Sequence, residues 1–362
     1  MAKRLAYDRV LFVLILGLVT FGLVMVFSAS AVISMERYHD PYYFLMRQGM
    51  GVALGMMLML MAMRYDYRKL KNPLIVYAAM CVSVFLLGLV QLLDRAHNTH
   101  RWIRLGFLSF QPSEFAKLTA ILFTAFYLES RMKQVNELRT FGPVAAYVAV
   151  LAGLIVFEPD LGTTIAIALV VMVMLYSAGI RMRYVGYTAV ASLPVLYMLV
   201  FHVHYRRERI LAFLHPWRDA QGVGFQIVQS LIAVGTGGIT GLGLMKGKQK
   251  LFFLPEPHTD FIFAVICEEL GLLGAIALLA AFVVYLQRGL RIVRGAPDTF
   301  GKLLAVGITS MVVLQALINI SVVTGIIPNK GIPLPFISYG SSSMIVMLAA
   351  SGVLLNLSQH VE

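Results

Sequence analysis

The sequence predicts an all-α polytopic membrane protein, and three observations support that prediction. Of its 362 residues, 59% are hydrophobic and only 13% are charged. Its mean hydropathy is +0.80, whereas soluble domains are roughly 45–50% apolar and about 25% charged. The apolar residues also come in blocks of about 20 residues, the length that a membrane-spanning helix requires. We therefore expect a single membrane domain over residues 1–362, without a soluble domain.

The apolar blocks predict about ten spans. The first is expected to stay in the protein, because it is longer than a signal peptide's apolar region and no small-residue cleavage site follows cleanly. Glu158, Pro159 and Asp160 separate two blocks and are expected to form a hairpin tip, since proline stops the helix before it. The predicted spans are residues 10–32, 44–63, 73–93, 113–129, 142–157, 161–179, 184–203, 260–286, 303–326 and 341–358.

Lysine and arginine are concentrated in alternate short loops, so the positive-inside rule places both termini in the cytoplasm. The formal net charge of +12 is then explained by cytoplasmic loops and anionic lipid headgroups, and no nucleic-acid partner is expected. The exception is the long segment 204–259 between the seventh and eighth spans, which is basic although it is predicted to lie outside. Cys81 and Cys267 lie in apolar blocks and indicate neither a disulfide nor a thiolate metal site.

Polar residues gather at the predicted outer ends of the spans. Glu114 and Lys117 are three residues apart and can pair on one helix face. They form either a structural ion pair or a site where Lys117 helps to hold an anionic headgroup. Asp160 either caps the helix that follows it or contacts a substrate. Lys330 lies outside against the charge trend, so it is a candidate for contact with an anion.

The outer segment contains six glycines between Gly235 and Gly247, followed by Lys248, Gln249 and Lys250. Glycine-rich backbone with basic residues can cradle phosphate oxygens. A flexible re-entrant loop packed between helices explains the pattern equally well. The run is not a P-loop, because no GxxxxGK[ST] motif follows a strand.

Asp260 begins the eighth predicted span, directly after His258 and Thr259. A carboxylate there is energetically unfavourable and indicates a function, although an N-cap-like role is the alternative. Cations suit a diphosphate leaving group, and a carboxylate suits the deprotonation of an acceptor hydroxyl. The outer segments therefore favour glycosyl transfer from a lipid-linked diphosphate sugar. The outer cations in question are Arg101, Lys117, Arg209 and Lys330.

Several long motifs resemble those of the SEDS family (shape, elongation, division and sporulation), in the family's order and over nearly the full chain. Two positions depart from the family pattern: Ser341 replaces a usual second glycine, and LMKGK follows Gly243 where another glycine and a Ser or Thr are usual. The motifs are GLVMVFSAS (22–30), RWIRLGFLSFQPSEFAKL (101–118), EPDLGTT (158–164), FQIVQSLIAVGTGGITGLGL (225–244), LPEPHTDFIFAVICEELG (254–271) and GIPLPFISYGSSS (331–343).

The resemblance implies a peptidoglycan glycosyltransferase that polymerises lipid II, the undecaprenyl-diphosphate-linked disaccharide-pentapeptide. It implies Asp260 as the general base of an inverting transfer, with undecaprenyl diphosphate leaving. It also implies a location at the outer face of the bacterial cytoplasmic membrane and work with a class B penicillin-binding protein transpeptidase, among other divisome or elongasome proteins. The motifs favour the cell-division branch, acting at the septum, over the elongation branch.

No cofactor is expected with certainty. A divalent cation such as Mg or Mn could assist at the diphosphate, although no metal-ligand spacing is present. A lipid II flippase is the competing class; the position of the polar residues at the outer boundary, away from mid-membrane, argues against it. The residues expected to contact the substrate are Arg47, Arg101, Glu114, Lys117, Asp160, Arg209, Gln226, Gln229, Ser230, Lys250, His258, Thr259, Lys330, Ser338 and Ser342.

Overall fold

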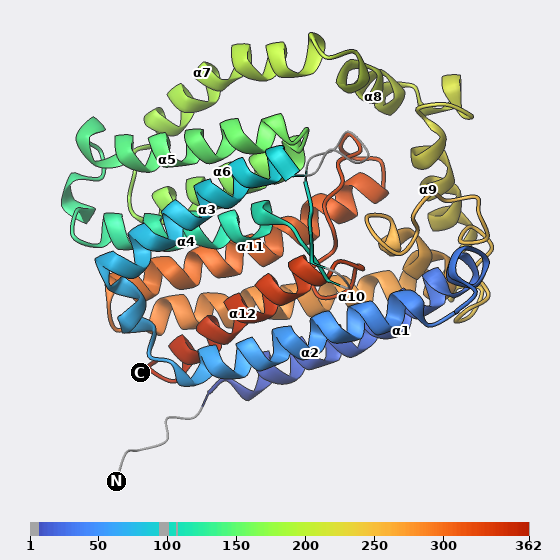
Figure 1. Cartoon of the computed structure of the whole chain (residues 1–362), viewed down its shortest axis with the longest axis horizontal. Coiled ribbons are helices and arrows are strands. Elements are labelled where there is room, and N and C mark those ends of the chain that lie inside the picture. The colour runs from blue at the N-terminus through green and yellow to red at the C-terminus, as the bar shows by residue number, and fades with distance from the viewer. Residues whose placement is uncertain (1–6, 94–100, 106–107, 362) are drawn as a thin grey trace.

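The protein is a bundle of long helices, seen in a computed structural model that describes residues 7–93, 101–105 and 108–361. The long helices run side by side, and both chain ends lie at the same end of the bundle (Figure 1). The helices are α1 (Arg9–Tyr38), α2 (Tyr43–Arg64), α3 (Pro73–Leu93), α4 (Pro112–Glu129), α5 (Leu138–Phe157), α6 (Leu161–Ser177), α7 (Met182–Phe201), α8 (His204–Leu214), α9 (Phe225–Thr236), α10 (Ile262–Gly295), α11 (Thr299–Val323) and α12 (Ser341–Ser358), with 3₁₀ turns at η1 (Tyr67–Lys71), η3 (Met132–Gln134) and η4 (Pro216–Asp219).

Seven helices in the described part of the chain are long and apolar enough to cross a membrane: α1, α2, α3, α5, α10, α11 and α12. The other three predicted spans also form helices, α4, α6 and α7, which are not among these seven. The helical, multi-pass architecture is therefore confirmed. The number of ten crossings and the cytoplasmic placement of the termini stay predictions.

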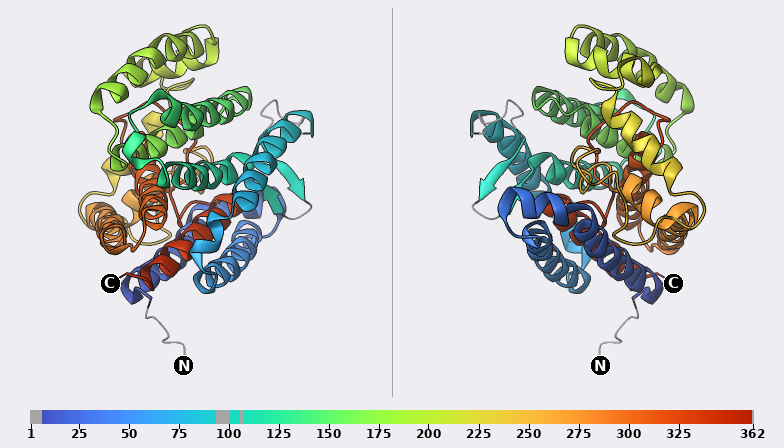
Figure 2. Two further views of the ribbon diagram at one scale, coloured as in Figure 1. Left: turned by 90° about the vertical axis from the view of Figure 1, so that its left-hand side faces the viewer. Right: turned by 90° about the vertical axis from the view of Figure 1, so that its right-hand side faces the viewer.

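The core of the bundle lies around α11 and α12. Along α12 nearly every side chain is buried, mostly against α2 and α11. Close approach of α2 and α12 depends on Gly352, because a Cβ atom there would lie 2.4 Å from the carbonyl oxygen of Met59. Small residues permit such backbone contact between membrane helices. The end-on views in Figure 2 show α1 and α2 on one side of this core and α5 to α7 on the other.

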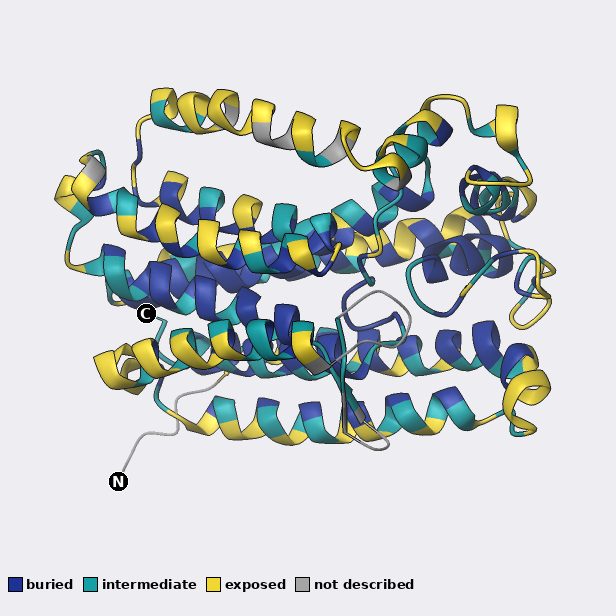
Figure 3. Ribbon diagram, turned by 45° about the horizontal axis from the view of Figure 1, so that its top comes forward, coloured by how far each residue is buried: buried dark blue, intermediate teal, exposed yellow. Residues whose placement is uncertain are grey.

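Helix α7 is the least buried of the long helices. Its described side chains are almost all exposed (Figure 3), and its main packing partner is the next helix in the chain, α8. Because a lipid-exposed helix needs no polar cover, this exposure fits an apolar environment around α7.

The segment predicted as a long loop, 204–259, is largely folded: it contains α8, η4 and α9. A second difference is a short antiparallel hairpin of β1 (Ile103–Leu105) and β2 (Leu108–Phe110) in an otherwise helical chain. The hairpin is held to the start of α12 by Ser342, whose hydroxyl donates to the Ser109 carbonyl at 2.6 Å and accepts from the Gln111 N–H at 3.0 Å. Two hydrogen bonds to backbone therefore attach the β2 side of the hairpin to α12.

Candidate active site

Asp260 lies in a cavity of about 460 Å³ at the end of the bundle away from the chain termini. The cavity is formed where the start of α6, helix α8 and the loop 324–340 meet the turn before α10. Its polar lining combines two acids at the helix starts with several cations. The charged and polar lining residues are Arg101, Asp160, Arg206, Arg209, Gln226, Glu256, Thr259, Asp260, Asn329 and Lys330.

The backbone of Asp260 is held by α11. The Asn319 side-chain amide donates to the carbonyl oxygens of Asp260 at 2.7 Å and of Ile332 at 2.8 Å. The same side chain therefore joins the turn before α10 to the loop 324–340. Gly331 leaves room for the carboxylate, because a Cβ atom there would lie 2.8 Å from Asp260 Oδ2. These contacts fix the position of the carboxylate in the cavity.

The surroundings of Asp260 make it a stronger base than an ordinary aspartate. Asp260 precedes the first residue of α10, outside the spanning helix. Burial and the nearby negative charge of Asp160 raise its pKa to about 6, while Arg101 and Arg209 oppose that rise. A carboxylate with this pKa is still mainly ionised at neutral pH, and general bases work best when their pKa lies near the operating pH.

Asp160 has the capping role that the sequence left open, and contact with a substrate stays a prediction. It caps α6, since its Oδ1 accepts from the Thr163 N–H at 3.0 Å and its Oδ2 accepts from the Thr163 hydroxyl at 2.8 Å. It also lines the cavity. Burial lowers the pKa of Lys330, and the charge of Asp160 opposes that shift. Asp160 therefore helps to keep the ammonium of Lys330 charged.

Arg101 holds the hairpin tip between α5 and α6 beneath the cavity. Its Nε donates to the Glu158 carbonyl at 2.7 Å and its Nη2 to the Pro159 carbonyl at 2.5 Å. Arg206 is similarly attached to backbone, donating to the Leu199 carbonyl at 2.9 Å. Cations that are positioned by backbone contacts keep their charge available to a neighbouring anion.

Glu158 is a buried acid beside this site. Its side chain is fully buried, and neither carboxyl oxygen has a hydrogen-bond partner in the described part of the chain. Burial, together with the charge of Asp160, raises the pKa of Glu158 to about 9, although Arg101 opposes the shift. Glu158 is therefore protonated and neutral at pH 7.

We expect the Glu158→Gln variant to remove a pH dependence of stability. In the wild-type protein the unfolded carboxyl ionises above its ordinary pKa of 4.5 while the folded one stays neutral up to about 9, so stability falls as pH rises between these values. Glutamine has no such transition. Thermal unfolding between pH 5 and pH 9 should show a flatter profile for the variant and a higher melting temperature at pH 8. An unchanged slope would contradict the assignment.

Glu114 and Lys117 form the predicted ion pair. Their Oε1 and Nζ atoms are 2.8 Å apart and both side chains are buried. Lys117 also donates to Gln315 at 2.7 Å, and Gln315 in turn donates to the Pro333 carbonyl at 2.9 Å. The pair does not line the cavity. It connects α4 to α11 and to the loop beside Asp260, as the structural alternative predicted.

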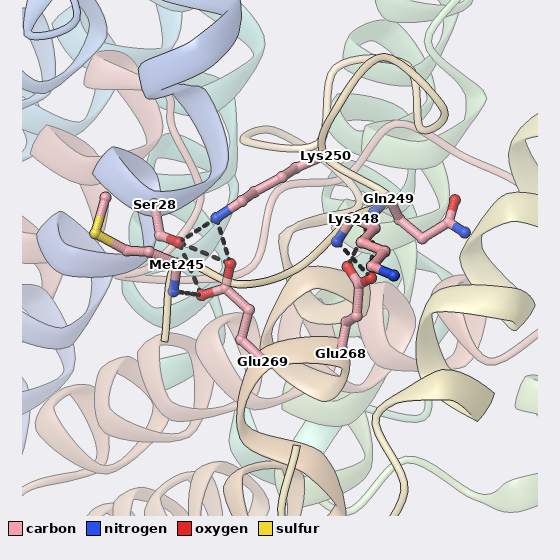
Figure 4. A network of polar contacts seen from close by, with 7 residues as sticks. All are labelled: Ser28, Met245, Lys248, Gln249, Lys250, Glu268 and Glu269. Atoms are coloured by element: carbon pink, nitrogen blue, oxygen red, sulfur yellow. Dashed lines mark hydrogen bonds and ion pairs between the residues drawn. The ribbon is translucent and has the colours of Figure 1, made fainter. Parts of the chain in front are cut away.

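The glycine-rich run belongs to a packed loop, several of whose backbone N–H groups donate to carboxylates of α10 (Figure 4). Glu269 accepts from the Met245 N–H at 2.9 Å, and Glu268 accepts from the N–H groups of Lys248 at 2.7 Å and Gln249 at 3.2 Å. The loop therefore surrounds carboxylates of the protein itself. The packed-loop alternative is therefore favoured for this run, because these carboxylates occupy donors that a phosphate would need.

Lys250 belongs to this network as well. Its ammonium lies 2.6 Å from Glu269 Oε1 and 3.0 Å from the hydroxyl of Ser28 on α1, and all three side chains are buried. The Ser28 hydroxyl also contacts both Glu269 oxygens, at 2.8 and 2.7 Å. Lys250 thus connects its loop to α1 and α10, and it does not line the cavity.

The loop reaches α10 at a break in that helix. Gly271 has φ 64° and ψ −163° inside α10, and a Cβ atom there would lie 2.4 Å from the backbone nitrogen of Gly241. The N–H groups of Leu242 and Gly243 donate to the Glu268 and Glu269 carbonyls at 3.0 and 2.9 Å. The break frees carbonyl groups that the loop then satisfies, which explains why glycine occurs on both sides of the contact.

The other predicted contacts lie around the cavity without lining it. Arg47 stacks over the Tyr43 ring at 4.7 Å. Ser230 donates to the Val323 carbonyl at 2.8 Å and Ser338 to that of Thr259 at 2.7 Å. His258 is buried against Phe44 at 4.3 Å between ring centroids, and burial lowers its pKa to about 4. Ser338 and Ser342 thus attach the loops beside the cavity, and Gln229 lies on α9 outside the cavity lining.

Sequence reasoning missed Arg206, Glu256 and Asn329 in the cavity, and Glu268 and Glu269 behind it. One signal was available: Arg206 and Arg209 are three residues apart, so a helix at 204–214 brings them to one face. Asn329 bonds to the Gln226 side chain at 2.8 Å, a contact between segments far apart in sequence. Nothing local to either residue predicts it.

The cavity offers few metal ligands. Within the described residues no group of three or more His, Cys, Asp or Glu side chains could hold a metal ion. Both oxygens of Asp160 already accept hydrogen bonds, which leaves Asp260 as the principal free carboxylate. The residues alone do not fit a protein-held divalent cation, and we derive no step through one.

The chain is similar to known proteins over nearly its whole length. Residues 8–362 match the FtsW, RodA and SpoVE family of cell cycle proteins. The chain is 45% identical to a probable peptidoglycan glycosyltransferase FtsW of Geobacter metallireducens, over 98% of this chain and 96% of the relative. Among solved structures, a chain of a peptidoglycan synthase complex for polymerization and crosslinking aligns with TM-score 0.79 at 31% identity, covering 98% of each chain. The rod shape determining protein RodA of Thermus thermophilus aligns with TM-score 0.73 at 28% identity, covering 99% of each.

Proposed function

Because the chain belongs to the FtsW, RodA and SpoVE family of cell cycle proteins, we propose that it is a peptidoglycan glycosyltransferase that polymerises lipid II. The observation that carries the proposal is the Asp260 carboxylate, whose pKa is raised to about 6, in a cavity that also contains Arg101, Arg209 and Lys330. An acceptor hydroxyl needs a base, and a departing diphosphate needs cations, so the cavity supplies both requirements.

In the proposed mechanism Asp260 accepts the proton of the C4 hydroxyl of an acceptor lipid II. The hydroxyl oxygen attacks the anomeric carbon of the donor strand, and the bond from that carbon to the diphosphate breaks with inversion from α to β. The electron pair stays on undecaprenyl diphosphate. A diphosphate leaves without protonation, so one carboxylate base is sufficient, unlike in hydrolases that must protonate an alcohol.

The cations stabilise charge that develops on the leaving group. Arg101, Arg209 and Lys330 come from three separate segments and face one cavity. Positioned cations act more strongly in a site from which water is largely excluded, and they need no reorganisation during the reaction. Arg206 and Asn329 are additional candidates to position the diphosphate or the sugars. Asp160 is proposed to orient Lys330 and to tune Asp260.

The rate of polymerisation should depend on pH through Asp260. The active form is the ionised carboxylate, so below about pH 6 the initial rate should fall about tenfold per pH unit, and above it the rate should level off. Replacing Asp160 by Asn keeps a side-chain cap on α6 but removes the negative charge that raises the pKa of Asp260. The midpoint should then move to lower pH. Initial rates with labelled lipid II between pH 4.5 and pH 8 measure both profiles.

In this comparison, thermal unfolding of both proteins at each pH serves as the control for loss of structure. A midpoint that stays in place or moves to higher pH in Asp160→Asn would refute the electrostatic link between the two acids.

We propose the cell-division role at the septum, with both termini in the cytoplasm and the Asp260 cavity at the outer face of the cytoplasmic membrane. The FtsW relative at 45% identity supports this role over the elongation role of RodA, at 28%. The related synthase complex joins polymerization to crosslinking, which supports a class B penicillin-binding protein transpeptidase as the partner of this chain.

A flippase for lipid II is the rival function, and one experiment separates the two. The purified protein and its partner transpeptidase are incubated with labelled lipid II in vesicles. Glycan strands on a gel support the glycosyltransferase, whereas exchange of lipid II between leaflets without polymer supports the flippase. The confinement of the charged lining residues to one end of the bundle favours the first outcome, because a through-path needs polar residues at mid-membrane.

A further inference from the structure

A second cavity, of about 590 Å³, lies at the end of the bundle that carries both chain termini. It is formed by the beginning of α1 and the last turns of α10. We call it the basic hollow and define it by Arg9, Arg288, Arg291 and Arg294, together with Asp8 and Ser358. The hollow is at the opposite end from Asp260, so it takes no part in the proposed transfer reaction.

The positive charge of the hollow is not balanced by the described part of the chain. Asp8 is the single acid that lines it, and Asp8 already accepts from the Leu11 N–H at 2.9 Å as the cap of α1. The same oxygen lies 3.5 Å from Nε of Arg288. The side chains of Arg9, Arg291 and Arg294 have no hydrogen bond or ion pair with any described residue.

Topology alone does not explain this arrangement. The positive-inside rule requires basic residues near helix ends, but it does not require them to converge on one hollow. Here the wall between the guanidiniums is apolar, formed by Val10, Ile292 and Val361. Val361 packs against the end of α10 at Gly295, where a Cβ atom would lie 2.3 Å from it. Convergent cations with an apolar wall match an amphipathic anion.

We propose that the basic hollow binds the phosphodiester headgroup of an anionic glycerophospholipid. Guanidinium groups bind phosphate oxygens through paired, charge-assisted hydrogen bonds. A basic pocket between the ends of membrane helices is where acidic lipid headgroups are recognised. The acyl chains have an apolar path away from the hollow, because Val10 and Val13 on α1 and Leu290 on α10 are exposed. A soluble phosphate would use the arginines but not this path.

The test uses the double variant Arg291→Gln/Arg294→Gln, whose side chains are exposed and make no hydrogen bond or ion pair with a described residue. The full-length protein is placed in nanodiscs of phosphatidylcholine containing none or one fifth phosphatidylglycerol. Retention of phosphatidylglycerol is measured by native mass spectrometry, and protection against heat is measured by the melting temperature. We expect phosphatidylglycerol to be retained and to raise the wild-type melting temperature. The variant should bind it at least about tenfold more weakly, from about 1 kcal/mol per basic side chain.

A matched control is Arg181→Gln/Arg183→Gln, which removes the same charge from the start of α7, outside the hollow, where both side chains are exposed. The control should bind phosphatidylglycerol as the wild type does. Equal loss in both variants would reduce the effect to general surface charge and overturn the site. Arg291→Gln/Arg294→Gln could melt at a lower temperature than the wild type in pure phosphatidylcholine. In that case Arg291→Lys/Arg294→Lys, which keeps the charge, should retain at least part of the phosphatidylglycerol binding.

Soluble ligands distinguish the source of the phosphate. Inorganic phosphate and glycerol 3-phosphate at the same concentration as a short-chain phosphatidylglycerol should give little protection. Protection by the soluble ions equal to that by the lipid would overturn the lipid assignment in favour of a soluble anion. Absence of any preference for phosphatidylglycerol over phosphatidylcholine in the wild type would overturn the proposal entirely.

Discussion

The Asp260→Asn variant should lose polymerisation by at least about 10²–10⁴-fold, the usual contribution of a general base, while it stays folded. Asparagine has nearly the same shape as aspartate, and the contact that holds the position uses the backbone carbonyl of residue 260, which accepts from Asn319 at 2.7 Å. Removal of the negative charge among Arg101, Arg209 and Lys330 changes the electrostatics but leaves the cavity intact. Single-turnover polymerisation of labelled lipid II measures the loss, and lipid II binding measures what remains.

Glu129→Gln is the matched control for this variant. Glu129 lies at the last residue of α4 and pairs with Lys71 at 2.7 Å, far along the helix from the cavity. The Glu129→Gln variant loses one carboxylate by the same kind of isosteric change, and it should retain normal polymerisation activity. Near-normal polymerisation by Asp260→Asn would remove Asp260 as the base, while a parallel loss of lipid II binding would assign it to substrate binding.

Lys250→Met should be the most destabilising single change outside the cavity. It leaves Glu269, which is fully buried, without the ammonium at 2.6 Å. Removing one partner of a buried ion pair typically costs about 3–5 kcal/mol, because the remaining charge stays buried and uncompensated. The loop then loses its attachment to Ser28 on α1. Because Lys250 lies ten residues before Asp260 in the chain, activity should fall together with stability. Denaturant titration of the solubilised protein measures the free energy of unfolding.

Two further variants separate the ion pair from a general effect of losing a lysine. Lys248→Met removes a neighbouring ammonium that is exposed, and since only the backbone N–H of Lys248 contacts Glu268, stability should stay within about 0.5 kcal/mol of the wild type. The double variant Lys250→Met/Glu269→Leu removes both charges and should recover part of the lost stability. If Lys250→Met had the same free energy of unfolding as the wild type, the ion pair of Lys250 with Glu269 would not contribute to stability.

Apolar patterning was enough to predict the helical membrane architecture, because a membrane-length run of apolar residues has few alternatives to a spanning helix. The bounds of α2, α3, α6 and α12 agree with the predicted spans within a few residues. The pairing of Glu114 with Lys117 was also predictable, since it depends only on residues three apart on a helix. In the segment 204–259 charge and glycine obscured α8 and α9, so a loop was predicted there.

Local sequence could not show which polar residues meet. Lys250 and Lys330 look alike in sequence, as basic residues in outer loops, yet Lys250 is bound to Glu269 while Lys330 lines the cavity with Asp160. The glycine run that contains Gly241 suggested a flexible loop as one alternative, but Gly241 packs against Gly271 in a space that only glycine fits. Each difference comes from contacts between segments far apart in the chain, which short-range periodicity does not encode.

Composition and apolar patterning are therefore enough to predict the membrane class of the protein, most of its helices and the prominence of Asp260. Burial of charge in an apolar setting is unfavourable wherever the chain folds. Which cations surround Asp260, and that Lys250 instead pairs with Glu269, follow only from the packing of the helices and loops. That packing also brought Asp160 near enough to raise the pKa of Asp260. Electrostatic coupling depends on distance and burial in space, and both are set only when the helices pack.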